Sequence, residues 1–238
     1  MIAHGRPLDP MDLGLSIAAS GMVAEQIRED QLANDLANSS TPGYKPVEDT
    51  QGAFGQLLLQ SQGRAVGTID TQTQITGQSL SLAQGALQST GEPLDFAISG
   101  TGFFAVHTAS GTRYTRDGQF TESAQGDLVD ANGNQVLSQS NQPVKVGTDG
   151  TVSASSLGVF NVPKPVAQGE NLFSGTAGGK ASGVAQSGTL EASSVDAATT
   201  TVNMIASLNT YQAGQQAIQA INQTLQQSAS ATGSLGGG

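Results

Sequence analysis

Apolar residues near the N-terminus recur at helical spacing over residues 11–39. The positions of this stripe are Leu15, Ala18, Ala19, Met22, Leu32, Ala33 and Leu36. Separations of three, four and seven residues place such side chains on one face of an α-helix. Pro42 cannot continue a helix and Gly43 permits a turn, so the helix is predicted to end before this pair.

A second helical pattern covers residues 194–228. Its apolar face is formed by Met204, Leu208, Tyr211, Ile218, Ile221 and Leu225. Met204, Tyr211, Ile218 and Leu225 recur every seven residues, which is the period of a coiled coil. Because such a helix is marginal by itself in water, we expect it to pack on the N-terminal helix and on neighbouring molecules.

The flanks of the second helix predict where it begins and ends. Ser193 or Ser194 is expected to cap its N-terminus, with Asp196 in the first turn. Residues 229–238 are rich in Ser, Ala and Gly, which predicts a flexible tail.

The middle of the chain has the short apolar segments and turn residues of β-structure. Tight turns are expected at Asp117-Gly118, Asn132-Gly133 and Asp149-Gly150. Residues 169–189 return to Gly and Ser, with Gly178-Gly179 as an expected flexible point. Residues 60–91 have sparse aliphatic side chains, so we expect extended segments that lie on a neighbouring surface; a partly disordered loop is the alternative.

These patterns predict an α+β protein, in which paired, coiled-coil-like N- and C-terminal helices flank a central, mostly antiparallel β domain. The predicted division is a helical domain of residues 1–41 and 190–228, a connecting segment of residues 42–92, a β domain of residues 93–189 and a tail of residues 229–238.

Composition restricts the classes of partner. The 238 residues contain no Cys, so disulfides and Cys-ligated metals are excluded. The net charge of -10 argues against nucleic acid or an anionic membrane as the main partner. No run of about 18 apolar residues is present, so no membrane insertion is expected, and the first residues lack the apolar core of a secretory leader.

The chain offers no defensible catalytic, cofactor or metal site. His4 and His107 are about a hundred residues apart, and Glu92 and Asp95 form a carboxylate pair by sequence alone. Asp130, Asn132 and Asn134 have the spacing that opens a calcium loop, but Gln135 stands where glycine is required. We therefore expect the protein to bind no cofactor and not to be an enzyme.

Several stretches resemble one known family. Residues 31–45, Gln-Leu-Ala-Asn-Asp-Leu-Ala-Asn followed by Ser-Ser-Thr-Pro-Gly-Tyr-Lys, resemble the N-terminal signature of flagellar rod and hook proteins, with Asp35 in place of an Asn. Residues 188–211 resemble its C-terminal signature. Between them, similar segments occur in family order at residues 98–106, 114–120, 126–129 and 169–173. The chain therefore resembles the flagellar basal-body rod proteins, in the proximal and distal rod subgroup that has a β domain.

The resemblance implies a structural subunit that self-assembles into a helical tube and transmits torque from motor to hook. It implies contacts with copies of itself, with other rod and hook proteins and with the flagellar type III export apparatus, and a location in the basal body after export across the cytoplasmic membrane. A short hook-type or other axial protein is the alternative in this class, and a secreted cell-wall-acting enzyme is the alternative from another class.

Assembly is expected to use the terminal helices, which would fold together on incorporation. The residues assigned to the interface are Leu15, Met22, Leu32, Asn34, Leu36, Asn38, Pro42, Gly43, Tyr44, Val202, Asn203, Met204, Leu208, Tyr211, Ile218, Ile221 and Leu225. Asn34, Asn38 and Asn203 are expected either to fix register across subunits or to be solvated or capping residues.

Overall fold

The computed structural model describes residues 10–235, except 54–55, 62–63, 71–72 and 170. The chain divides into two compact units. The first, here called the helical unit, contains the residues up to Asn34, Glu48–Ser79 and the residues from Ala198 onward. The second, here called the β body, contains Asp35–Val47 and Leu80–Ala197. This grouping joins the residues that follow the first helix to the β body.

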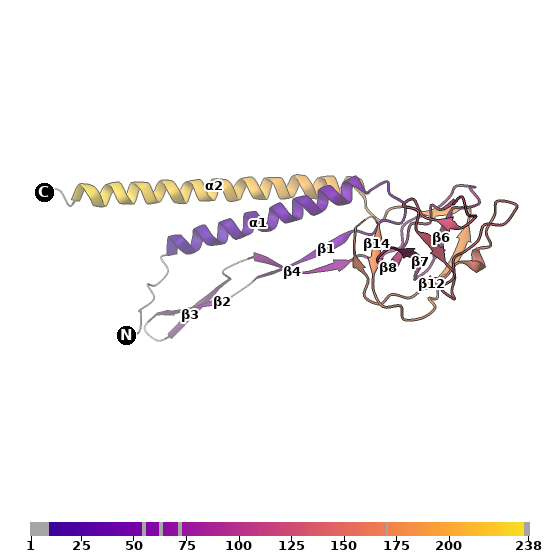
Figure 1. The fold of residues 1–238 in the computed structure, drawn as a ribbon. Coiled ribbons are helices and arrows are strands. Elements are labelled where there is room, and N and C mark those ends of the chain that lie inside the picture. Colours follow the sequence, from indigo (N-terminus) through magenta and orange to yellow (C-terminus); the bar gives the residue numbers. More distant parts are fainter. Residues whose placement is uncertain (1–9, 54–55, 62–63, 71–72, 170, 236–238) are drawn as a thin grey trace. The chain divides into compact units, whose positions relative to one another are not determined.

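The two long helices are present, which confirms the predicted α+β class (Figure 1). Helix α1 (Pro10–Ala37) ends before the predicted Pro-Gly break, where the Ser39 hydroxyl donates to the Leu36 carbonyl at 2.7 Å. Helix α2 covers Ala197–Leu235. It continues through the segment predicted to be a flexible tail, because Ala229 and Ala231 favour a helix and the first glycine there is Gly233.

The predicted start of α2 was wrong. Ser194 donates its hydroxyl to the Tyr44 carbonyl at 3.1 Å, and the Ser193 hydroxyl accepts the Val195 amide at 3.2 Å. Asp196 directly precedes the helix and does not lie in its first turn. The serines belong to a turn that joins the β body to α2.

The segment after α1 forms strands. These are β1 (Val47–Ala53), β2 (Gln56–Ser61), β3 (Arg64–Asp70) and β4 (Thr73–Leu80). Strand β1 pairs with β4, and β2 pairs antiparallel with β3 (Figure 1). Between Leu59 and Gln60 the register of β2 on β3 shifts by a bulge or irregularity.

The β body contains one main sheet of the order β13-β14-β8-β7-β11-β10-β9, with β12 also on β7. Its strands are β7 (Phe103–Thr108), β8 (Gly111–Thr115), β9 (Thr121–Glu122), β10 (Leu128–Val129), β11 (Gln135–Leu137), β12 (Val159–Phe160), β13 (Val166–Ala167) and β14 (Leu172–Ser174). Neighbouring strands of this sheet pair antiparallel, as predicted.

Two further strand pairs complete the β body. Strand β6 (Phe96–Ser99) pairs antiparallel with β15 (Val184–Ser187), and β5 (Leu87–Ser89) pairs antiparallel with β16 (Thr189–Glu191). A 3-10 turn, η1 (Ala154–Ser156), precedes β12. Strand β16 thus brings the residues just before α2 into the β body.

Strand β7 has buried residues on both of its faces. Phe104 and Val106 belong to one core cluster, and Phe103 and Ala105 belong to a second. Side chains alternate between the faces of a strand, so the continuous apolar run of β7 serves both clusters. The Phe104 ring meets the Phe120 ring edge-on with centroids 5.4 Å apart. The core of the β body is therefore built around this central strand.

The predicted turns divide into two that form and one that does not. Gly133 and Gly150 have positive φ of 81° and 72°, and their amides close turns onto Asp130 and Gly147. At Asp117-Gly118 no hairpin forms. A Cβ on Gly118 would collide with the Phe96 carbonyl, and the Phe96 amide donates to the Gly118 carbonyl at 2.9 Å. Gly118 is thus a site of close backbone packing and was wrongly predicted as a tight turn.

Candidate assembly surface

The least exposed residues of α2 follow a coiled-coil pattern. Among the side chains of α2 that the structure describes, they are Thr200, Met204, Ser207, Tyr211, Gly214, Ile218, Ile221 and Leu225. Their separations alternate between four and three residues, which is the spacing of a seam packed against a partner helix. Four of the predicted residues at sevenfold spacing lie in this seam. Thr200, Ser207 and Gly214 were missed because they are not apolar.

The partner of this seam is α1. The Ser207 hydroxyl donates to the Glu25 carboxylate at 2.7 Å. A Cβ on Gly214 would lie 2.8 Å from Met22 Cγ, and one on Gly14 would lie 3.7 Å from Ile221 Cδ1. Residue numbers rise along α1 as they fall along α2, so the helices run antiparallel. Small residues at these points let the two backbones approach closely.

Each helix also carries apolar side chains outside the seam. On α2, Val202 is 65% exposed, Ile205 55% and Leu208 37%; on α1, Val23 is 57% exposed and Ile27 43%. Val202 and Leu208 were assigned to the interface by the sequence, whereas Ile205, Val23 and Ile27 were not. Leu15, Met22, Leu32 and Leu36 are half-buried, and Asn34 and Asn203 are exposed. The pair of helices thus leaves an aliphatic surface uncovered.

Side chains of the family-like stretch, residues 31–45, hold the end of α1 in place. Tyr44 donates its hydroxyl to the buried Asp35 carboxylate at 2.9 Å. Burial, reinforced by this carboxylate, raises the pKa of the Tyr44 phenol well above its usual range. The side-chain amide oxygen of Asn38, Oδ1, accepts the Thr41 hydroxyl at 3.2 Å. Asp35, the departure from the family pattern, therefore has a definite structural partner.

The Pro-Gly pair packs against the backbone of the β body. Asn171 donates its amide to the Pro42 carbonyl at 2.9 Å, and the Gly43 amide donates to the Glu191 carbonyl at 2.7 Å. Gly43 has φ of 66°, and a Cβ there would collide with the Arg116 carbonyl group. A residue larger than glycine does not fit at this position.

A buried charge cluster lies beside this contact and consists of Lys45, Arg116 and Glu191. Lys45 Nζ is 2.5 Å from Glu191 Oε1, and Arg116 Nη1 is 2.9 Å from Glu191 Oε2. The three side chains are 1%, 5% and 0% exposed, respectively. The cluster was not predicted from the sequence, although Lys45, Arg116 and Glu191 lie within the stretches that resemble the family.

Backbone groups satisfy much of the remaining polarity of the cluster. The Gly85 amide donates to Glu191 Oε1 at 2.9 Å, and Lys45 donates to the Ala83 carbonyl at 2.5 Å. Arg116 Nη2 donates to the Gly100 carbonyl at 2.9 Å, and the guanidinium carbon lies 5.4 Å from the centroid of the Phe103 ring. Desolvation by burial lowers the pKa of Lys45, and the Glu191 carboxylate opposes that shift.

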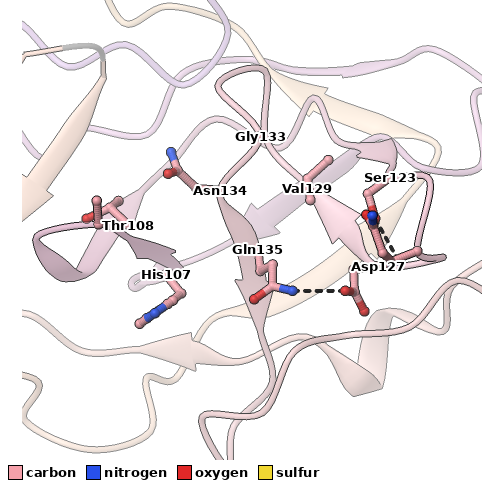
Figure 2. Close-up of a pocket in the computed structure, with 10 residues that line it drawn as sticks. His107, Thr108, Ser123, Asp127, Val129, Gly133, Asn134 and Gln135 are labelled. Atoms are coloured by element: carbon pink, nitrogen blue, oxygen red, sulfur yellow. Dashed lines mark hydrogen bonds between the residues drawn. The ribbon is translucent and has the colours of Figure 1, made fainter.

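A polar hollow of about 410 Å³ lies beside β7, β10 and β11 and is lined in part by His107. Figure 2 shows the residues that line it. Its buried Asp127 accepts from the Gln135 amide at 2.9 Å and pairs with Lys145 at 2.5 Å. These bonds, chiefly the one from Lys145, hold the pKa of Asp127 below its usual range. The Asp127 carboxylate is thus bound by Gln135 and Lys145 within the β body.

The other candidate groups for chemistry are dispersed. Asp130 accepts the Asn132 and Asn134 amides at 2.9 and 2.8 Å, which closes the loop between β10 and β11. Glu92 is exposed and Asp95 is buried, and His4 lies outside the described residues. Within the described ranges, no three His, Asp or Glu residues gather as metal ligands, and neither helix has the length and hydropathy needed to span a bilayer.

Three family profiles match separate parts of the chain. The profile described as flagella basal body rod protein matches residues 15–45. The flagellar hook protein FlgE/F/G D1 domain matches residues 97–154. The flagellar basal body rod FlgEFG protein C-terminal matches residues 186–231. They occur in the order that the sequence motifs predicted.

Curated relatives extend the match over most of the chain. Flagellar basal-body rod protein FlgF of Caulobacter vibrioides is 32% identical over 188 residues, which cover 70% of this chain and 74% of the relative. Flagellar basal-body rod protein FlgG of Borreliella burgdorferi is 31% identical over 247 residues, which cover 85% and 92%. FlgG of Buchnera aphidicola subsp. Schizaphis graminum is 32% identical over 256 residues, which cover 89% and 96%.

The chain belongs to the flagellar basal-body rod protein family. Membership confirms the predicted family and gives the chain the role of a structural rod subunit in the flagellar basal body. Each of the three matched regions of the rod family contains one member of the buried charge cluster: Lys45, Arg116 and Glu191.

Proposed function

We propose that this rod subunit assembles with copies of itself and with other rod and hook proteins through the aliphatic surface of its helical unit. The observation that carries the proposal is the exposure of Val202 and Ile205 on α2, at 65% and 55%. Burying an aliphatic side chain of this size against a neighbour stabilises an assembly by roughly 1.5–3 kcal/mol. A repeated contact between different faces of a subunit does not close on itself and so builds a filament or tube.

The composition supports close packing of many similar neighbours. Only 12% of the residues are charged, so few charges would need to be desolvated between subunits. We propose that the helical unit becomes fully ordered on incorporation, since the seam between α1 and α2 is made partly of small residues and buries little by itself. A subunit in that state would suit export by the flagellar type III apparatus before assembly in the cell envelope. This role requires no catalysis.

The test replaces the two aliphatic side chains by charges. In the variant Val202→Asp with Ile205→Asp, we expect a folded subunit that no longer enters rods, because buried unpaired carboxylates oppose the contact. Basal bodies from a complemented deletion strain would be imaged by electron microscopy. The matched control is Asn222→Asp with Gln226→Asp, which adds the same charge at exposed polar positions of α2. Normal rods with the first variant would contradict the proposal.

The same images distinguish the alternatives within the class. Loss of the rod on deletion supports the rod subunit, whereas an intact rod that lacks a hook would indicate a hook-type protein. A cell-wall-acting enzyme would lose hydrolytic activity together with motility when Glu92 and His107 are replaced; we expect motility to persist in that variant.

A further inference from the structure

We infer that Glu191 is a positioning residue that fastens both helix-flanking segments, residues 41–47 and 188–194, to the β body, so that the two segments become ordered together. The inference concerns one chain and does not depend on the polymer. Lys45 and Glu191 are 146 residues apart in the sequence, and Arg116 and Glu191 are 75 apart. The cluster is therefore complete only when three distant segments have met.

The backbone joins the same two segments directly. Besides the bond from the Gly43 amide to the Glu191 carbonyl, the Ser194 amide donates to the Tyr44 carbonyl at 3.2 Å. The Ala192 amide donates to the Ala86 carbonyl at 2.8 Å, and a Cβ on Gly85 would collide with the Ala192 carbonyl oxygen. The segments thus lie against each other and against residues 83–86, with the Glu191 side chain at the point where they meet.

Electrostatics makes the arrangement cooperative. Two cations and one anion are enclosed, so Glu191 is the acceptor shared by both cations. Without it, the buried Lys45 and Arg116 keep, among the described residues, the Ala83 and Gly100 carbonyls as acceptors and the Phe103 ring as a neighbour. Removing one partner from a buried ion pair costs far more than the net stabilisation of the intact pair, because a charge remains desolvated. If either flanking segment detaches, a buried charge on the other segment or on Arg116 loses its ion-pair partner. The two segments are therefore expected to detach together.

The test is hydrogen–deuterium exchange on the full chain with Glu191→Gln, which keeps the shape and removes the charge. We expect amide exchange to accelerate about tenfold or more in residues 41–47, 83–86 and 188–194 together. Exchange in the core strand β7 is expected to accelerate less. The matched control is Glu122→Gln on the exposed strand β9, which should leave exchange unchanged in these segments. Acceleration confined to residues 188–194 would overturn the inference.

A second variant keeps the test decisive if Glu191→Gln does not fold. Lys45→Met removes one cation and leaves a balanced pair of Glu191 and Arg116, so a milder effect is expected. Exchange should nevertheless accelerate in residues 188–194, far from the substitution in the sequence. Unchanged exchange there would contradict the coupling. In a thermal series, the midpoint shift of Lys45→Met combined with Glu191→Met should be smaller than the sum of the single shifts; additive shifts would also overturn it.

Discussion

The helical unit and the β body use their apolar residues in opposite ways. Among the described side chains of α1 and α2 in the helical unit, only Ala24, Thr200 and Ser207 are buried. In the β body, large side chains such as Phe96, Phe104 and Ile98 are fully enclosed. The β body therefore has a core of its own, whereas the described helices of the helical unit carry aliphatic side chains that stay exposed.

This difference separates folding from assembly within one chain. Substitutions in the β body are expected to act on the stability of the monomer, because its hydrophobic contacts are internal. Substitutions on the exposed faces of α1 and α2 are expected to leave the monomer nearly unchanged and to act on the polymer.

The largest effect is expected in the core around β7. Phe104→Ala removes a ring that is fully buried and in contact with Phe120, so the free energy of unfolding should fall by about 3–5 kcal/mol. Leu208→Ala on α2, where the side chain is 37% exposed, should cost less than about 1 kcal/mol. Urea denaturation of both variants measures the difference. Equal losses would show that the helical unit also depends on an internal core.

Replacing Asp117 is expected to raise the free energy of unfolding, by less than Phe104→Ala lowers it. Burial, the largest cause, together with the carboxylates of Asp130 and Asp95, raises the pKa of Asp117 to about 6. A carboxyl group whose pKa is raised by folding stabilises the folded state while it is protonated. This contribution is fully present below the pKa of the group in the unfolded chain, and it is lost as the pH rises through about 6. Asp117→Asn keeps the acceptor for the Gln119 amide, so it should stabilise the protein at pH 7 by about 1–2 kcal/mol, and less near pH 4.

Asp149→Asn is the control for that experiment. Hydrogen bonds from the Thr151 hydroxyl and amide hold the pKa of Asp149 below its usual range. Its replacement should therefore lower stability at pH 7, with the loss fading as the pH falls. Thermal melts between pH 4 and 8 check both signs. A wild-type-like pH profile for Asp117→Asn would mean that burial does not penalise this carboxylate.

The spacing of apolar residues predicted those elements that have a strong hydrophobic pattern of their own. The sevenfold spacing of Met204, Tyr211, Ile218 and Leu225 identified the seam of α2, and the short apolar segments in the middle of the chain predicted β-structure, to which the apolar run of β7 belongs. Short strands in regions rich in small residues gave weaker patterns. Strands β14 and β15 lie in the segment that reads as Gly and Ser, and they form because Phe173 and Ala185 reach the core clusters.

Long-range contacts account for most of what the sequence did not predict. Lys45, Arg116 and Glu191 are charged residues, and such residues are usually exposed. Their burial depends on segments separated by 75 and 146 residues. Likewise, Asp117-Gly118 has the composition of a tight turn, but the approach of the Phe96 backbone is what requires the glycine. The interface residues assigned on the helices stay predictions, which the assembly experiment addresses.

The smallest effect is expected at the seam itself. Ser207→Ala removes a buried hydroxyl that donates to the Glu25 carboxylate and carbonyl at 2.7 and 3.2 Å. A typical intramolecular hydrogen bond contributes about 0.5–1.5 kcal/mol net, and Glu25 is only half-buried, so its carboxylate regains water when the hydroxyl is lost. The monomer should lose less than this contribution in urea denaturation. Thr210→Ala, whose exposed hydroxyl bonds within α2 to Ala206, is the matched control and should change less still. A loss of several kcal/mol for Ser207→Ala would mean that the two helices form a stable pair before assembly, which would remove the contrast between the two units.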